Sequence, residues 1–296
     1  MADTAGNRRL ITYDDTAELV HLVGSSPAAS PKGFGDLRGW GAGSLTSYLP
    51  VLQHDTGIRL LSEDYAISAG FPPADSTLIA GGQDASAVTS HFTKLGWKAR
   101  DGELATAPNP GLSGPRADAA FYSVEIPQVR ASGSDVAAGG LGADLSQAGP
   151  VSGPTLAGDP LISALAACLG NVVAAQIAMS TPGAALSGKA PVAMAAGVLR
   201  PLSATATPQA VTCVAWAGAT TATEYATDVR QALATGKSAT TNEPFSSLLV
   251  HPSVTSLGGR QHIVRWQAQT PSQASLVLTM SEECGLPALP GCARQP

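Results

Sequence analysis

Side chains that could act as a catalytic base or as a metal ligand are few and widely spaced in this sequence. No two histidines lie within four residues of each other, so no local metal-binding pair exists; the five are His21, His54, His91, His251 and His262. His54 and Asp55 could form a base and its orienting carboxylate, although adjacent side chains seldom point at each other. We therefore predict no metal site and no cofactor.

Motifs for nucleophilic and phosphate chemistry are also missing. The segment Gly41–Ser44 resembles part of a G-x-S-x-G nucleophile elbow, but the closing glycine is absent. Ser44 is better interpreted as the cap of a helix. The glycine-rich segment Gly139–Gly142 opens no predicted helix, so it is not expected to bind phosphate. A hydrolase would need Ser, His and Asp brought together from distant loops.

Two acidic pairs, Asp14–Asp15 and Glu63–Asp64, are candidates for cation binding. A calcium site would need alternating oxygen ligands around a glycine turn, and neither pair supplies that pattern. We expect both pairs to lie in solvent at the ends of secondary-structure elements.

The four cysteines all lie in the second half of the chain. Cys284 and Cys292 flank a short segment with two prolines and two glycines, which can bring its ends to disulfide distance. Cys168 lies on a predicted apolar helix and Cys213 on a predicted apolar strand, so these two would pair in the core. Two disulfides indicate an oxidising compartment outside the cytoplasm. Free buried thiols and a zinc site are the alternatives.

The tryptophans suggest one hypothesis about binding. Trp97 and Trp266 occupy similar positions in the two halves, in the first strand after a predicted helix. A strand tryptophan usually packs in the core. The alternative is a surface on which a sugar or another ligand stacks, with Trp97, Trp266 and Trp40 as its candidate ligand-binding residues.

Composition excludes several partners. The net charge is −5 and only 13% of residues are charged, with no basic stripe, so neither nucleic acid nor an anionic membrane surface is expected as a partner. The most apolar run, Leu161–Met179, is interrupted by polar residues and is predicted to be a buried helix, not a membrane span. The N-terminus lacks a signal-peptide pattern. We expect that a signal was removed and that a lipid anchor could be attached upstream.

Elements follow one another in the same order in the two halves. The first contains predicted strands, a helix and a hairpin, at Tyr65–Gly70, Ser76–Gly81, Asp84–Leu95 and Trp97–Ala107. The second repeats this order at Val192–Leu199, Ala210–Gly218, Thr223–Ala234 and a hairpin of His262–Gln269 with Ala274–Met280. Each half opens with helical sequence, which is weak at Ser44–Gln53 because of Pro50 and stronger after Asp159.

This order predicts an α+β protein of two similar strand–strand–helix–hairpin halves, each with an antiparallel sheet packed against helices. An internal duplication explains the match, and coincidence is the alternative because the order is common. The predicted domains are residues 1–135, a Gly/Pro-rich linker at residues 136–158, and residues 159–296 with the disulfides.

Segments such as Ser76–Ala99 and Asp159–Met179, together with the small-residue bias and the late cysteines, resemble uncharacterised secreted proteins or lipoproteins of GC-rich actinobacteria. The resemblance implies location at the cell envelope. The function we expect is that of an extracytoplasmic, secreted or lipid-anchored, non-catalytic binding or interaction protein, whose partner is a protein or small molecule. A secreted hydrolase and a structural or assembly subunit are the alternatives.

Overall fold

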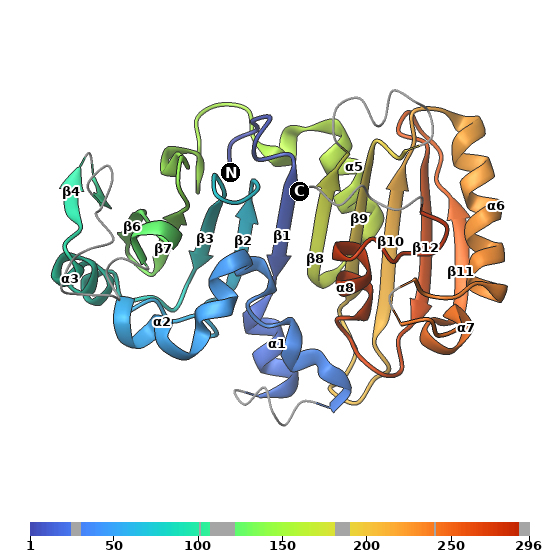
Figure 1. Cartoon of the computed structure of the whole chain (residues 1–296), viewed down its shortest axis with the longest axis horizontal. Coiled ribbons are helices and arrows are strands. Elements are labelled where there is room, and N and C mark those ends of the chain that lie inside the picture. Colours follow the sequence, from blue (N-terminus) through green and yellow to red (C-terminus); the bar gives the residue numbers. More distant parts are fainter. Residues whose placement is uncertain (25–30, 101, 107–121, 181–189, 240, 290–296) are drawn as a thin grey trace. The chain divides into compact units, whose positions relative to one another are not determined.

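A computed structural model describes residues 1–24, 31–100, 102–106, 122–180, 190–239 and 241–289 (Figure 1). The chain divides into two compact units. The first unit comprises Met1–Glu18 and Arg38–Asp159, and the second comprises Leu19–Leu37 and Pro160–Pro296. Each combines an antiparallel sheet with helices, so the α+β class is confirmed.

The sheet of the first unit has the strand order β1-β2-β3-β7-β6-β5-β4. Its strands are β1 (Leu10–Asp14), β2 (Tyr65–Ala69), β3 (Ser76–Ala80), β4 (Lys98–Arg100), β5 (Glu103–Ala105), β6 (Gln128–Ser132) and β7 (Asp135–Gly139). Its helices are η3 (Trp40–Tyr48), α2 (Leu49–Thr56), α3 (Ala85–Leu95), η4 (Leu145–Gln147) and η5 (Leu156–Gly158). α1 (Thr16–Val23) runs from this unit into the second.

The sheet of the second unit has the strand order β8-β9-β10-β12-β11. Its strands are β8 (Val172–Met179), β9 (Ala193–Leu199), β10 (Gln209–Ala215), β11 (Val250–Ser256) and β12 (Ile263–Gln269). Its helices are η2 (Pro31–Leu37), α5 (Pro160–Leu169), α6 (Ala219–Thr235), α7 (Phe245–Leu248) and α8 (Leu276–Glu282).

The two units share one order of strands. In each, three consecutive antiparallel strands are followed by a helix, α3 or α6, and then by a pair of strands. The second strand of that pair lies beside the third strand of the first three, so β7 pairs with β3 and β12 pairs with β10. The first unit differs by the short β4–β5 hairpin, which it inserts before β6.

Local signals placed α3 correctly. The side chain of Asp84 accepts a hydrogen bond from the Ala87 amide at 3.0 Å and caps the helix. Gly96 ends it with φ 106°, in the left-handed region. Val88 and Phe92 face a core that includes Ala66 and Ile79. The helix therefore covers the face of the sheet to which Ala66 and Ile79 point.

Helices cover both faces of the second sheet. Cys213 is paired in register with Arg265, and the neighbouring Thr212 with Trp266, so the two rows point to opposite faces. α5 lies on the Cys213 face, because Cys168 is bonded to Cys213. α6 lies on the Trp266 face, where Tyr225 packs.

Two predictions in the second unit were wrong. The run Leu161–Met179 is not one helix, because α5 ends at Leu169 and Gly170 (φ 79°) turns the chain into strand β8. Both elements are buried, so neither helical nor strand periodicity separates them in the sequence. The segment Ala274–Met280 contains the start of α8, not a strand. β12 forms its hairpin with β11, whose mainly exposed residues carry no apolar pattern.

Differences also arise in the first unit. Residues 136–158, predicted to be a linker, contain most of β7 together with η4 and η5. Small residues fill this segment because β7 is buried between β3 and β6, where Val136, Ala137 and Ala138 pack. Pro50 does not limit the helix near Ser44–Gln53, because it stands in the first turn of α2, where a missing N–H costs nothing.

Candidate functional site

The two acidic pairs do not lie wholly in solvent, contrary to the prediction. Asp14 is 0% exposed and Glu63 is 2% exposed. Thr16 is also 0% exposed and Arg38 is 5% exposed. We call Asp14, Thr16, Arg38 and Glu63 the buried polar cluster. No sequence motif marks Thr16 or Arg38, and the signal near them is the pair of polar residues Thr12 and Asp14 in the buried strand β1.

Asp14 holds the backbone at the start of η3. Its Oδ1 accepts from the Gly41 amide at 2.7 Å, and its Oδ2 accepts from the Gly39 amide at 3.2 Å. The Gly41 carbonyl accepts in turn from Ser68 Oγ at 2.8 Å. A Cβ atom at Gly41 would overlap the Ala66 carbonyl oxygen and lie 2.6 Å from the Asp14 amide. Only glycine allows this backbone to approach β1 and β2 this closely.

Thr16 links the two buried carboxyl groups. Its Oγ1 lies 2.5 Å from Asp14 Oδ2 and 2.7 Å from Glu63 Oε1. A hydroxyl has one proton to donate, so it can donate to only one of these oxygens. The other contact is a hydrogen bond only when the second carboxyl is protonated. The geometry therefore calls for one proton shared among Asp14, Thr16 and Glu63.

Charge in the cluster is balanced by Arg38. Its Nη2 donates to the Leu61 carbonyl at 3.1 Å, and its guanidinium is attracted to Glu63 and Asp14. Burial raises the pKa of Asp14 to about 7, against the opposing effect of its hydrogen bonds with Thr16 and Gly41. Burial also lowers the pKa of Arg38. With one proton held, two carboxyl groups and one guanidinium carry no net charge.

A second polar group lies on the exposed side of α2. His54 Nδ1 lies 2.7 Å from Asp55 Oδ1, so these adjacent side chains do point at each other. Tyr122 donates to Asp55 Oδ2 at 2.9 Å, and His91 Nδ1 lies 3.1 Å from the Asp55 carbonyl oxygen. The hydrogen bond with His54 is the main cause that lowers the pKa of Asp55. The side chain of His54 is 92% exposed, so its ring is open to solvent.

The candidate ligand-binding tryptophans are not brought together on one surface. Trp97 is 3% exposed, and its indole donates to the Ile126 carbonyl at 3.0 Å in the core of the first unit. Trp266 is fully buried beneath α6 in the second unit. Trp40 is half-buried at the start of η3. The rings of Trp97 and Trp266 therefore pack in the cores of their units, as is usual for a tryptophan in a strand.

For the cysteines that the structure describes, the bonding agrees with the predicted disulfides. Cys168 and Cys213 form a disulfide, with their Cα atoms 6.3 Å apart. Cys284 is also bonded in a disulfide. Its predicted partner, Cys292, lies outside the described residues.

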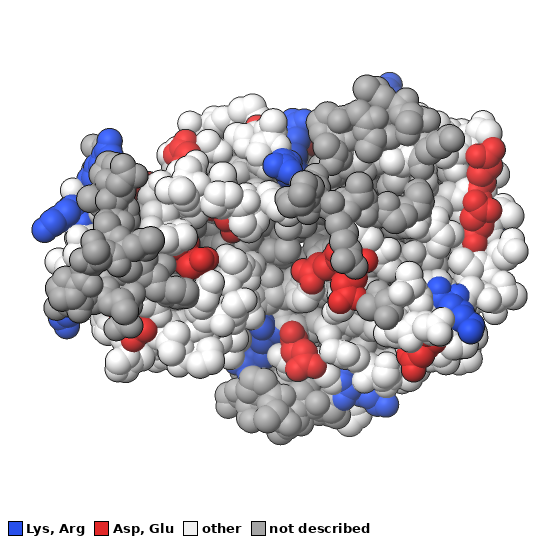
Figure 2. All heavy atoms as spheres, viewed as in Figure 1, with Lys and Arg blue, Asp and Glu red and all other residues white. Residues whose placement is uncertain are grey.

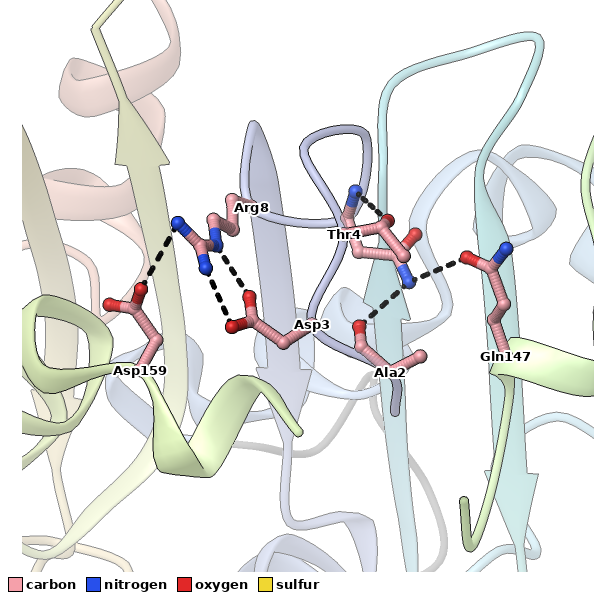
Figure 3. Close-up of polar contacts among 7 residues, drawn as sticks. Ala2, Asp3, Thr4, Arg8, Gln147 and Asp159 are labelled. Atoms are coloured by element: carbon pink, nitrogen blue, oxygen red, sulfur yellow. Dashed lines mark hydrogen bonds and ion pairs between the residues drawn. The ribbon is translucent and has the colours of Figure 1, made fainter. Parts of the chain in front are cut away.

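Residues at the N-terminus are held to the end of the first unit (Figure 3). Arg8 binds Asp3 through Nε at 2.5 Å and through Nη2 at 2.6 Å. Its Nη1 lies 3.3 Å from Asp159 Oδ2. Asn7 Nδ2 donates to the Ala2 carbonyl at 3.0 Å and to Gln147 Oε1 at 3.3 Å. These contacts explain how a segment without regular structure is ordered from its first residue.

Charged side chains are scattered over the face shown in Figure 2, where small separate red and blue areas interrupt a mostly uncharged surface. Among the described residues, no group of three or more His, Cys, Asp or Glu is arranged to hold a metal ion. None of the described helices is long and apolar enough to cross a membrane.

Comparison of the chain with protein-family models, with curated proteins and with solved structures found no match.

Proposed function

We propose that the chain is an exported, non-catalytic binding protein of the cell envelope, either secreted or lipid-anchored. The disulfide between Cys168 and Cys213 supports export, because such bonds persist in oxidising compartments. The sealed position of the buried polar cluster supports a structural role for the charged groups, since a substrate would have to reach Asp14 at 0% exposure.

The surface that supports binding is one face of the first sheet. Tyr13, Ile67 and Leu78 are register neighbours across β1, β2 and β3, and all three are half-buried. Tyr65 lies beside Tyr13, with ring centroids 6.4 Å apart, and is 39% exposed. We call these four side chains the apolar face. It lies opposite α3, because Ala66 and Ile79 point to the other side of the sheet.

The arrangement of the second unit supports a choice of occupant for the apolar face. There the face opposite the connecting helix is covered by α5, whose Ile162, Leu165 and Leu169 are buried. In the first unit, Leu145 and Ala148 pack on the equivalent face at Ala137, and Ile11, Ala69 and Ser76 on the same face are buried as well. The occupant we propose for the remainder is an apolar helix of a partner protein, lying as α5 lies on its own sheet.

The outer edges of the sheets are less suited to docking an extended peptide. β11 contains Pro252 and an irregular register, and Arg230 Nη2 donates to its Val254 carbonyl at 3.3 Å. β4 is three residues long and carries Lys98 and Arg100. Proline, bulges and cationic side chains discourage strand addition at sheet edges. A face is therefore favoured over an edge as the binding surface.

A synthetic helix tests this proposal. The probe is the α5 sequence, residues 159–170, with serine at Cys168, which cannot displace α5 itself because α5 is held by its disulfide. We expect binding that Ile67→Asp weakens about tenfold or more, because burying one such side chain is worth roughly 1.5–3 kcal/mol. Leu202→Asp is the control, since Leu202 is 100% exposed elsewhere and its change should leave binding intact. Absence of binding to the wild-type protein would contradict the proposal.

Export is tested separately. Titration of thiols under denaturing, non-reducing conditions should detect none in protein purified from its native compartment. Four reactive thiols would overturn the assignment. The N-terminus of the native gene product should show a removed signal, and a lipid-acceptor cysteine there would establish the anchored form.

A hydrolase is the second candidate function. The observation that favours it is His54, whose Nδ1 lies 2.7 Å from Asp55 Oδ1 while the ring remains open to solvent. Such a pair can orient a base for an approaching serine. Labelling by a serine-reactive probe, lost in His54→Ala, would establish this candidate and remove the non-catalytic proposal.

We also propose that the two units arose by internal duplication. The shared strand order and the equivalent helices α3 and α6 support this origin. Sequences of relatives in which the two halves are more alike would test it. Halves that resembled different single-unit proteins would contradict a duplication.

A further inference from the structure

The only described hydrogen-bond partner of the Glu63 carboxylate is the hydroxyl that it shares with Asp14. Oε1 of Glu63 lies 2.7 Å from Thr16 Oγ1, while Oε2 is buried without a hydrogen-bond partner. Asp14 is held more firmly, because the amides of Gly39 and Gly41 both donate to it. If the cluster lost its proton, Glu63 would therefore be the carboxylate to leave.

We propose that the buried polar cluster is a proton-dependent latch, which holds the segment Leu60–Asp64 against β1 and opens as its shared proton is lost. The latch joins three parts of the first unit: the end of β1, the start of η3 and the segment before β2. It is a conformational device within the fold and does not depend on the proposed binding function.

Among the described residues, the charged groups that face Asp14 are Glu63 and Arg38. Asp15, next to Asp14, instead accepts from the Glu18 amide at 3.0 Å and caps α1. Asp64, next to Glu63, is exposed beside Gly81. The charge balance of the closed cluster is therefore set by two carboxyl groups and one guanidinium. Without the proton it retains one uncompensated negative charge, which is costly in a buried site.

The sign of the pH dependence follows from the closed and open states. The closed state holds its proton up to about pH 7, because burial raises the pKa of Asp14 to about 7. When Glu63 leaves with its segment, water reaches Asp14 and the neighbouring like charge is gone, so the pKa of Asp14 falls toward its ordinary value of 3.8. Between these values the open state binds fewer protons, so opening becomes more favourable as pH rises. Above the upper value, the opening equilibrium should level off.

Hydrogen exchange measured by peptide mass spectrometry between pH 4.5 and 8.5 tests the latch. After correction for the intrinsic rate, we expect exchange at residues 60–65 to rise by up to tenfold per pH unit and then level off near pH 7. Peptides from β3 and α3 should show no such change, since the latch opens locally. An equal change in those peptides, or no change at residues 60–65, would overturn the proposal.

The variant Glu63→Gln tests whether the pH dependence comes from the buried polar cluster or from other acidic groups of the protein. Glutamine keeps the shape and can donate to Thr16, so Thr16 donates to Asp14 and no extra proton is needed. The variant should lose the pH dependence of exchange at residues 60–65, while Glu224→Gln, an exposed control on α6, should retain it. If Glu63→Gln does not fold, carboxyl carbon shifts of the wild-type protein give the same answer. A single carboxyl titrating near pH 7 supports the latch, and titration of every carboxyl below pH 5 refutes it.

Discussion

Cys168, near the end of α5, is bonded to Cys213 in β10, and Arg265 Nε donates to the Cys168 carbonyl at 2.8 Å. The disulfide fixes α5 on the Cys213 face of the second sheet. No counterpart of α5 precedes β1 within the described residues, and there the apolar face is half-exposed. The two units therefore share their strand order apart from the β4–β5 hairpin, and they differ in that the second sheet carries α5 on the face opposite its connecting helix.

Removal of this disulfide should destabilise the second unit. The double change Cys168→Ala with Cys213→Ala is expected to cost roughly 4 kcal/mol in the free energy of unfolding, because the bond closes a loop of 45 residues. Urea unfolding followed by circular dichroism measures the change. Reductant should lower the stability of the wild-type protein more than that of the variant, and equal sensitivity would contradict this role.

Substitution of Gly41 should disrupt the first unit. Gly41→Ala places a Cβ against the backbone of Ala66 and Asp14, so we expect a loss of about 3 kcal/mol or more in the free energy of unfolding. Gly153→Ala is the matched control, since nothing lies within 4 Å of a Cβ there. Chemical denaturation measures the free energy of unfolding of both variants. Equal values for the two would contradict the predicted clash at Gly41.

Substitution of Asp14 by asparagine should destabilise the first unit. Both oxygens of Asp14 accept from backbone amides, and asparagine would present its own N–H groups to one of these donors. Asp14→Asn is therefore expected to cost about 1–3 kcal/mol. Asp84→Asn is the control, because asparagine caps α3 as well as aspartate does. Equal unfolding midpoints for the two variants would argue against this geometry.

The contact between Arg8 and Asp3 should order the N-terminal segment. Arg8→Lys loses the bidentate geometry, so the amide of Asp3, which donates to the Pro154 carbonyl at 2.9 Å, should exchange faster. Arg8 lowers the pKa of Asp3, so protection should persist above its ordinary value of 3.8 and fall as pH drops below it. Arg260→Lys serves as control, and unchanged exchange in Arg8→Lys would refute the assignment.

Elements with a strong local signal were predictable from the sequence. The Asp84 cap, the Gly96 terminus and the i, i+4 spacing of Val88 and Phe92 together specify α3. Gly102, with φ 82°, turns the β4–β5 hairpin as expected. These features depend on neighbouring residues, so no knowledge of the rest of the fold was needed.

The segment from Ala274 to Met280 shows where local reasoning fails. Its alternation of leucine and valine suits a strand, yet most of it is helical in α8. The place beside β12 is taken by β11, an edge strand that needs little apolar surface. Which segment pairs with a strand is decided by competition among distant parts of the chain.

Sequence alone predicted the disulfide between Cys168 and Cys213, the α+β class and the positions of α3, β2 and β3, because each follows from residue type or short-range spacing. Only the tertiary structure decided that Asp14 and Glu63 are buried around one hydroxyl and that Trp97 and Trp266 are core residues. The physical reason is that burial, and with it the pKa of Asp14, depends on groups such as Gly41 and Glu63, which are distant along the chain.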